Sequence, residues 1–268
     1  KTYLTFNLRI PMTLQPSLPS AMLTIFTCPK AFSDPHIGLI QRNAIRSWMA
    51  MVPQPEILLM GDDPGVAEAA AEFRLRHVPD VARNMHGTPL VPSVFDKARA
   101  AASNDIIAYV NADIILGRDF ADAVNACAIL HRFLLVGRRW NTKIEEPLDL
   151  SRTETVNELV KKTRGEGRSG GSQAMDYFVF RGNPWGGGIH PFALGRCFWD
   201  NWLLFGALAG GIPVIDASAV ATAVHQDHDY AHAGYLTAEE LCKGEEVAAN
   251  RQLAAEHIFD VLDCSHCL

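Results

Sequence analysis

Short apolar runs alternate with amphipathic segments over the first half of the chain. Leu23–Thr27 and Glu56–Met60 are rich in aliphatic and β-branched residues, which predicts buried strands. Apolar residues recur at helical spacing over 37–51, and 65–73 is rich in Ala and Glu, which predicts two helices. Strands that alternate with helices indicate parallel pairing through right-handed crossovers. The first half therefore predicts a doubly wound α/β sheet.

The same patterns extend the prediction to the rest of the chain. They predict a third strand over 74–78, a loop over 81–92, a helix capped by Ser93 that runs to about Ser103, and a strand over 106–110. Further along they predict a helix over 119–132, strands over 133–137 and 176–180, a Gly-rich turn over 185–188, a helix over 198–208, one or two strands within 213–224, and a closing helix over 238–262. The basic, Gly/Ser-rich stretch 161–173 is long enough to be a mobile lid.

We expect a single domain with two halves and short ends. Residues 1–20 contain three prolines and no clear periodicity, which predicts a tail or linker. Residues 21–116 form the ligand-binding half of the sheet, and 117–262 form the acceptor and catalytic half of the same domain. Residues 263–268 are expected to be a tail, in which Cys264 and Cys267 lack the second ligand pair of a structural zinc module.

Composition narrows the class of protein. With 268 residues, 48% hydrophobic and 20% charged, the chain can bury a full core. The net charge of −6 and the absence of a dominant Lys/Arg run argue against a nucleic-acid partner. No apolar run reaches the roughly 18 residues that a transmembrane helix needs. Six scattered cysteines in a chain of this size indicate a reducing compartment, so we expect a cytoplasmic protein, with peripheral membrane contact left open.

One acidic residue stands between two apolar runs, in the segment Asn111-Ala112-Asp113 that follows the strand over 106–110. A carboxylate at the end of a buried strand must be hydrogen-bonded, paired or metal-bound, because an unpaired buried charge costs several kcal/mol. Open α/β sheets bind their ligands beyond the carboxyl ends of the strands. Asp113 is therefore the first candidate for a functional residue.

A second polar cluster follows a later strand and contains His225, His228, Asp229 and His232. Together with Asp113, one or two of these residues suit Mg²⁺ or Mn²⁺ that is shared with substrate phosphates. The chain has no G-x-G-x-x-G after its first strand, no Walker A pattern and no G-x-S-x-G elbow. A dinucleotide-dependent dehydrogenase, a P-loop protein and an α/β-hydrolase are thereby disfavoured.

The order and spacing of these residues resemble those of nucleotide-sugar-dependent glycosyltransferases with the GT-A fold, particularly family 2-like sequences, over roughly 23–232. The resemblance implies a GT-A-like, Rossmann-type doubly wound mixed sheet flanked by helices. Asn111-Ala112-Asp113 stands where that family has an Asp-x-Asp motif that holds the metal and the donor diphosphate. Asp200, within Trp199-Asp200-Asn201-Trp202, stands where the family has its catalytic base, and His225, with His228 second, where a His completes the metal site.

The resemblance also implies contacts for the donor and the sugar. Residues 21–116 become the nucleotide-sugar-binding half, with the donor near Thr27, Pro29, Lys30, Arg42, Asp62, Asn111, Ala112 and Asp113. Because the motif lacks its first acid, Lys30, Arg42, Arg138, Arg139 or the basic lid are candidates to compensate the diphosphate charge. The expected substrate contacts are Tyr177, Trp185, Asp176, Trp199 and His228. Of these, Tyr177 and Trp185 are expected to stack on a sugar ring.

The resulting hypothesis is an inverting sugar transfer from a nucleoside-diphosphate donor to a glycan, lipid-linked or small-molecule acceptor, with Mn²⁺ or Mg²⁺ as cofactor. Asp200 would deprotonate the acceptor hydroxyl, and a retaining mechanism becomes the better guess if no acid lies below the anomeric carbon. Two alternatives stay open. One is a metal-dependent hydrolase that uses His225, His228, Asp229 and His232, and the other is a non-catalytic sugar-nucleotide-binding protein.

Overall fold

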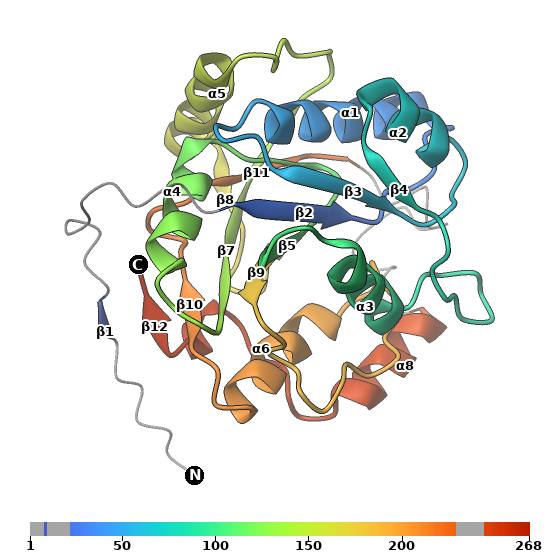
Figure 1. Ribbon diagram of the computed structural model, residues 1–268, viewed down its shortest axis with the longest axis vertical. Helices are drawn as coiled ribbons and strands as arrows, with labels where there is room; N and C mark the ends of the chain where they lie inside the picture. Colours follow the sequence, from blue (N-terminus) through green and yellow to red (C-terminus); the bar gives the residue numbers. More distant parts are fainter. Residues whose placement is uncertain (1–7, 10–21, 229–243) are drawn as a thin grey trace.

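The computed structural model describes residues 8–9, 22–228 and 244–268. The strands in these ranges join in one mixed sheet with helices on both faces (Figure 1), which confirms the predicted α/β class. Across the sheet the strand order is β1-β12-β10-β7-β9-β5-β2-β3-β4, while β6, β8 and β11 pair off this path. Among the described residues, no helix is both long and apolar enough to cross a bilayer.

The strands are β1 (Leu8–Arg9), β2 (Leu23–Thr27), β3 (Glu56–Met60), β4 (Arg76–Val78), β5 (Ile106–Val110), β6 (Ile114–Ile115), β7 (Phe133–Thr142), β8 (Arg168–Ser169), β9 (Met175–Arg181), β10 (Val214–Asp216), β11 (Ala223–Gln226) and β12 (His266–Cys267). The helices are α1 (Pro35–Met49), α2 (Val66–Phe73), α3 (Val91–Ala101), α4 (Arg118–Cys127), α5 (Thr153–Glu166), α6 (Trp199–Ala209), α8 (Glu245–Ala254) and the 3₁₀ helix η2 (Val261–Asp263).

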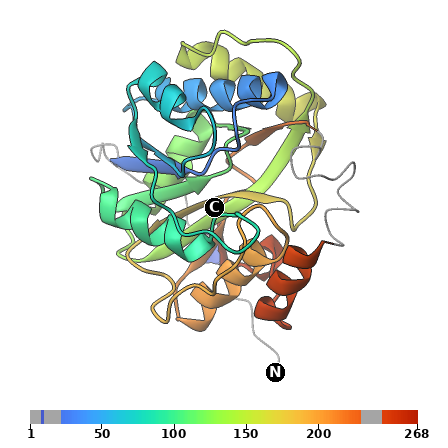
Figure 2. The same ribbon diagram turned by 90° about the vertical axis from the view of Figure 1, so that its right-hand side faces the viewer.

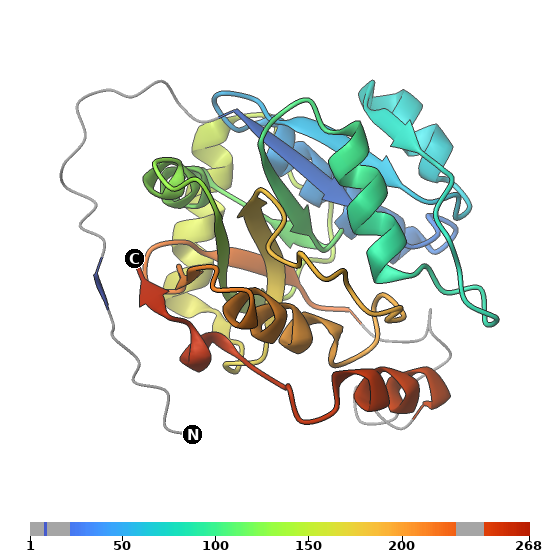
Figure 3. The same cartoon turned by 60° about the horizontal axis from the view of Figure 1, so that its bottom comes forward.

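Two helical layers enclose the sheet (Figure 2). Helices α1, α2 and α4 pack on one face through a core that includes Trp48 and Phe120. Helices α3, α6 and α8 cover the other face, which Figure 3 brings forward, and their core includes Phe95 and Trp199. Helix α5 packs against β6 and β11 in a smaller third cluster. Alternation along each strand sends successive side chains to the two cores.

The topology places several chain segments at one edge of the sheet. Strands β2, β3 and β5 pair in parallel, so their carboxyl ends meet at that edge. Strand β9 runs antiparallel between β5 and β7, so its amino end lies at the same edge. Strand β7 continues beyond Gly137 and pairs with β11 in parallel. Residues that follow β5, begin β9 and extend β7 are therefore neighbours.

The pairing of β7 with β9 shifts register between Val136 and Arg138, at Gly137. A Cβ at this position would collide with the Tyr177 hydroxyl oxygen. Glycine therefore allows β7 to bend past β9 and to carry its second half toward β11.

Helix α1 is fixed at both ends by side-chain hydrogen bonds. Asp34 caps its start by accepting from the backbone N–H groups of His36 at 2.8 Å and Ile37 at 2.9 Å, and Pro35 occupies the first turn. Near its end, the Trp48 indole N–H donates to the Ile114 carbonyl at 2.9 Å. The second bond ties α1 to the segment that follows Asp113.

Three predicted elements differ in the structure. Helix α3 begins at Val91, two residues before the predicted cap, and the Ser93 hydroxyl instead accepts from the backbone N–H of Ala82 at 2.8 Å. The predicted lid over 161–173 is wrong, because its first part lies in α5 and Arg168 pairs with β7 through β8. Within the described part of the predicted closing helix 238–262, only α8 is α-helical.

The predicted C-terminal tail is also ordered. Strand β12 pairs in parallel with β10 and with β1, so two residues of the expected N-terminal tail also join the sheet. The Cys264 side chain is buried against the α6 layer. The reading of Cys264 and Cys267 as a frayed end is therefore wrong, because the backbone after Cys264 completes the sheet.

Phe95 offers a test of the α3 side of the core. Its ring lies 5.1–6.3 Å from five other aromatic rings and is fully buried. We expect Phe95→Ala to lower the free energy of unfolding by about 3–5 kcal/mol, because the neighbours cannot close the cavity, and Phe95→Leu to lower it less. Urea unfolding measures both. Met85→Ala, at a side chain that is 94% exposed, is the control and should change stability by less than about 0.5 kcal/mol.

Candidate functional site

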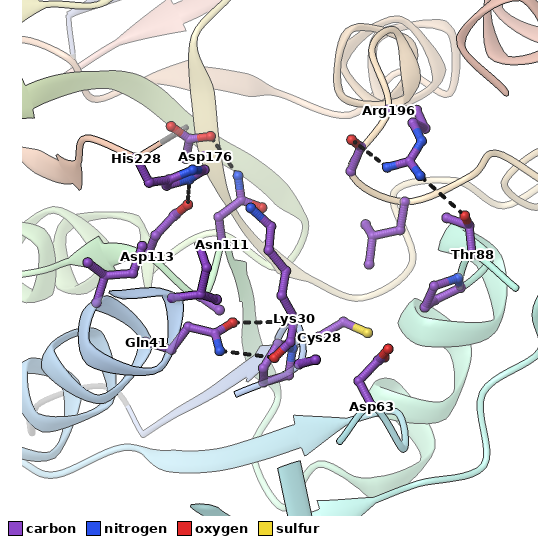
Figure 4. Close-up of a pocket in the computed structure, with 18 of the residues that line it drawn as sticks. Cys28, Lys30, Gln41, Asp63, Thr88, Asn111, Asp113, Asp176, Arg196 and His228 are labelled. Atoms are coloured by element: carbon purple, nitrogen blue, oxygen red, sulfur yellow. Dashed lines mark hydrogen bonds and ion pairs between the residues drawn. The ribbon is translucent and has the colours of Figure 1, made fainter. Parts of the chain in front are cut away.

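A pocket of about 610 Å³ opens at the edge where the carboxyl ends of β2, β3 and β5 meet. Its lining includes the β2–α1 loop, the turn after β5, the start of β9, the loop before α3, and the loop that leads into α6 with the first residues of that helix. Figure 4 shows Asp113, His228, Asp176 and Asn111 on one side and Thr88 and Arg196 on the other. The predicted site residues that line it are Pro29, Lys30, Asn111, Ala112, Asp113, Asp176, Trp199, Asp200, His225 and His228.

Asp113 lies between two imidazoles. Its Oδ2 is 2.9 Å from Nε2 of His228 and 3.7 Å from Nε2 of His225. Its Oδ1 is buried and has no hydrogen-bond partner. Burial opposes ionisation of Asp113, but the charge of His225, the hydrogen bond from His228 and the charge of Lys30 hold its pKa far below the ordinary value. Asp113 is therefore an anion at neutral pH.

The three side chains could together hold a divalent cation. One ligand atom from each of Asp113, His225 and His228 lies within 4.8 Å of the others. Burial lowers the pKa of His225, which favours the neutral imidazole that a metal requires. One carboxylate and two imidazoles suit Mn²⁺ better than Mg²⁺, which prefers oxygen ligands. The unpartnered Oδ1 of Asp113 and this donor set fit the predicted cofactor.

Gln226 holds the Asp113 turn in place, a role that sequence reasoning missed. Its fully buried side chain donates from Nε2 to the carbonyls of Asp113 at 3.0 Å and Ile40 at 2.8 Å. Its Oε1 accepts from Nδ2 of Asn43 at 3.1 Å. Gln226 thereby fastens the turn after β5 to helix α1. The one feature of the sequence that could have indicated this role is the position of Gln226 next to the predicted site residue His225.

Lys30 belongs to a loop that a second glutamine shapes. The Gln41 side chain accepts from the Lys30 backbone N–H at 2.7 Å and donates to the Lys30 carbonyl at 3.0 Å. Figure 4 shows the Lys30 side chain extending toward Asn111. This loop places a positive charge close enough to Asp113 to lower the pKa of that carboxyl.

Asp200 has the opposite electrostatic environment. It lies in the first turn of α6, beside Trp199, whose ring packs 5.4 Å from those of Tyr109 and Phe178. Its Oδ1 is buried without a hydrogen-bond partner. Burial, with a contribution from the charge of Asp176, raises the pKa of Asp200 to about 7. A carboxyl with this pKa can accept or release a proton near neutral pH.

Asp176 is paired on both sides. Its Oδ1 accepts from Nδ2 of Asn111 at 2.6 Å, and its Oδ2 accepts from Nη1 of Arg139 at 3.0 Å. Strand β7 carries two arginines that were predicted to compensate the charge of the diphosphate. Arg139 lines the pocket and Arg138 does not.

The acidic residue that lines the pocket after β3 is Asp63. Arg83 bridges Asp62 and Asp63, with Nη2 at 2.7 Å from an oxygen of each. The Asp62 side chain is 67% exposed and does not line the pocket, whereas Asp63 and Arg83 do. The pocket residue is therefore Asp63, one position after the predicted Asp62. Arg83 was not predicted, because no recognisable motif surrounds it in the loop after β4.

Four other predictions do not reach the pocket. Arg42 donates from Nε to Glu72 at 2.9 Å and lies over the Phe32 ring. Thr27 is fully buried within β2 and does not line the pocket. Tyr177 and Trp185 are buried in the core, so their predicted stacking on a sugar is wrong. Along β9, alternation directs Tyr177 to Phe120 on α4.

The predicted basic lid contributes nothing to the pocket lining. Arg164 donates from α5 to the Thr222 hydroxyl at 3.1 Å, and Arg168 pairs with Asp227 at 3.1 Å. The remaining members of the His cluster, Asp229 and His232, lie outside the described residues.

The donor set predicts metal binding that depends on Asp113. Calorimetry with Mn²⁺ alone should detect binding to the wild-type protein, and Asp113→Asn or His228→Ala should weaken it at least about tenfold, because each removes one ligand. His131→Ala, at an exposed histidine outside this pocket, is the control and should bind Mn²⁺ as the wild type does. Equal Mn²⁺ affinity in all four proteins would contradict the assignment.

The raised pKa of Asp200 predicts a pH-dependent cost to the fold. Its pKa is about 7 in the folded state against an ordinary 3.8, so the stability that its protonated form confers is lost as the pH rises toward 7. Asp200→Asn does not titrate and should gain about 2–3 kcal/mol relative to wild type between pH 5 and pH 8, by urea unfolding. Asp122→Asn, at a half-exposed side chain on α4, should show no such trend. A constant difference for Asp200→Asn would refute the shift.

Comparison with solved structures shows what this fold is similar to. Glucosyl-3-phosphoglycerate synthase from Mycobacterium tuberculosis, in complex with Mn²⁺, UDP and phosphoglyceric acid, matches with a TM-score of 0.51 and 14% identity, over 90% of this chain and 80% of that one. The same enzyme with Mg²⁺ and UDP matches with a TM-score of 0.51 and 13% identity over the same shares. A mannosyltransferase from Pyrobaculum calidifontis, in complex with GDP-Man and Mn²⁺, has a TM-score of 0.49 and 13% identity, over 91% of this chain and 78% of that one.

No protein-family model matches the chain, and no curated protein sequence matches it. The structural likeness therefore rests on the arrangement of the strands and helices rather than on the sequence. The overall arrangement of strands and helices is similar to that of glucosyl-3-phosphoglycerate synthase. This chain has the GT-A fold, as the sequence predicted.

Proposed function

We propose that this protein transfers a sugar from a nucleoside-diphosphate donor to an acceptor hydroxyl, with inversion at the anomeric carbon. One observation carries the proposal: a single pocket contains two buried carboxyl groups whose pKa values are shifted in opposite directions. Asp113 is an anion beside two imidazoles. Asp200 has a pKa of about 7 and a carboxyl oxygen without a hydrogen-bond partner. Such a pair separates a cation-binding acid from a proton-accepting one.

The donor fits the half of the pocket that the first strands build. Its nucleoside would lie beyond β2 and β3, near Pro29, Asp63 and Arg83, which line the pocket there. Its diphosphate would lie near Lys30 and Asp113. A divalent cation held by Asp113, His225 and His228 would supply positive charge to the diphosphate as it departs. The solved structures with this fold contain Mn²⁺ or Mg²⁺ with UDP, which agrees with such a donor.

Asp200 is the proposed base. The acceptor hydroxyl gives its proton to the Asp200 carboxylate while its oxygen forms a bond to the anomeric carbon. The bond from that carbon to the diphosphate oxygen breaks, and its electron pair leaves with the nucleoside diphosphate. Attack opposite the leaving group inverts the configuration, through an oxocarbenium-like transition state. Lys30 would stabilise the negative charge that develops on the leaving group.

The acceptor would enter along the Arg196 and Trp199 side, and we propose a glycan, a lipid-linked molecule or a small molecule with a free hydroxyl. The expected compartment is the cytoplasm, from the scattered cysteines of the sequence.

Asp200→Asn tests the proposal. With Mn²⁺ and UDP-glucose, UDP-GlcNAc, GDP-mannose or dTDP-glucose, the wild-type protein should release nucleoside diphosphate, to an acceptor or slowly to water. Asp200→Asn should lower kcat about 10²–10⁴-fold and change the Kd for the nucleotide less than about twofold, because the amide cannot accept the proton. The wild-type rate should rise with pH up to about 7 and then level, as Asp200 loses its proton. Asp122→Asn on α4 is the matched control.

Three results would contradict the proposal. If nucleotide sugars bind but Asp200→Asn leaves turnover unchanged, or if the wild type binds without turnover, the protein is not a transferase that uses this base. If no nucleotide sugar binds and metal-dependent hydrolysis of phosphate esters appears instead, the hydrolase alternative replaces it. NMR of the product anomer separates inversion from retention.

A further inference from the structure

Three side chains form a row across three neighbouring strands at the pocket edge. Asn111 follows β5, Asp176 lies on β9 and Arg139 lies on β7. The backbone N–H of Asn111 donates to the Asp176 carbonyl at 2.9 Å, and the backbone N–H of Arg139 donates to the Ala174 carbonyl at 3.0 Å, so the three residues are fixed in register. Side-chain bonds of 2.6 Å and 3.0 Å join Asp176 to Asn111 and Arg139.

The amide at position 111 is what makes a carboxylate at position 176 possible. Two carboxylates at the observed separation of 2.6 Å would repel each other, and one would have to take up a proton. An Asn in that position donates a hydrogen bond to the acid instead. The second acidic group beside Asp113 therefore comes from the adjacent antiparallel strand and not from the turn after β5. Arg139 balances its charge.

The Asp176 carboxylate can still accept from a ligand. Its side chain is only 7% exposed and it lines the pocket. Its hydrogen bonds to Asn111 and Arg139 leave part of the capacity of a carboxylate, which has about four acceptor sites. Asp176, Asp200 and His225 line the same pocket, and the charge of Asp176 acts on the pKa of the other two, so this acid lies near both the cation-binding residues and the base. In a sugar transfer, the ring of the donor sugar occupies the space between these two groups.

We propose that Asp176 recognises the hydroxyl groups of the donor sugar, and that Asn111 and Arg139 are positioning residues that hold its carboxylate toward the pocket. This inference rests on the proposed function. A carboxylate accepts hydrogen bonds and donates none when ionised, so the matching ligand is a glycosyl group with free hydroxyls on that side of its ring. A site built to bond a hydroxyl strongly disfavours an analogue that lacks it, because its own polar group is then left unpaired.

A swap of the two side chains tests the proposal. The proteins are the wild type, Asp176→Asn, Asn111→Asp and the double variant with both changes, with Asp105→Asn, an exposed residue before β5, as control. Calorimetry with Mn²⁺ compares UDP with UDP-glucose and GDP with GDP-mannose, and urea unfolding gives the stability of each protein.

Asp176→Asn should leave the Kd for UDP or GDP within about twofold and weaken the sugar-bearing nucleotide about tenfold, the scale of one hydrogen bond to a charged group. Asn111→Asp should lower stability by placing two carboxylates together. The double variant should recover that stability, because an amide again faces a carboxylate, but should not recover sugar recognition, since its acid is on the wrong strand.

Three outcomes would overturn the inference. If Asp176→Asn weakens the bare and sugar-bearing nucleotides equally, the acid serves the diphosphate or the cation. If the double variant recovers both stability and sugar recognition, the row is only structural. If the wild type binds nucleoside diphosphates and their sugar conjugates equally well, no residue of the row reads the sugar. Failure of the proposed function is seen separately, as a wild type that binds no nucleotide at all.

Discussion

Asp113 places a negative charge at the end of a fully buried strand, where burial by itself would keep the carboxyl protonated. The groups around Asp113 offset the free-energy cost of this burial. His225 and His228 approach from the end of β11, and Lys30 approaches from the loop before α1. Gln226 ties the same turn to α1 through the Asp113 carbonyl. The end of β11, the loop before α1 and the turn after β5 are thereby brought together around one carboxylate, and all three line the pocket.

The same pocket treats a second carboxyl in the opposite way. Burial is the dominant influence on the pKa of Asp200, and the charge of Asp176 raises this pKa further, while the charge of Arg139 only partly opposes them. One acid is thus permanently ionised and the other can exchange a proton near neutral pH. This separation of roles needs no unusual residue. It follows from which side chains surround each carboxyl, and the sheet topology determines those neighbours.

The antiparallel strand β9 is the topological feature that completes the site. Inserted between the parallel strands β5 and β7, it brings its amino end to the edge where their carboxyl ends lie. Asp176 and Arg139 reach the pocket for this reason, and Gly137 allows β7 to continue toward the histidines. At 13–14% identity to the solved structures, the overall fold is what the proteins share.

The sequence by itself determined the alternation of strands and helices in the first half and the GT-A fold, and it predicted Asp113, Asp200 and His225 as site residues, all three of which line the pocket. These signals are local, since a charged residue beside a buried apolar run is visible in the chain itself. It failed where a residue's role depends on a neighbour that is distant in sequence. Tyr177 and Asp176 are adjacent, yet pleating sends one into the core and the other into the pocket. The supposed lid became α5 and β8, and the supposed tail became a strand, because packing and pairing partners outweighed their polar composition. Gln226 and Arg83 were not predicted, because their hydrogen bonds join segments that are distant in sequence, and such bonds leave no mark on the order of residues.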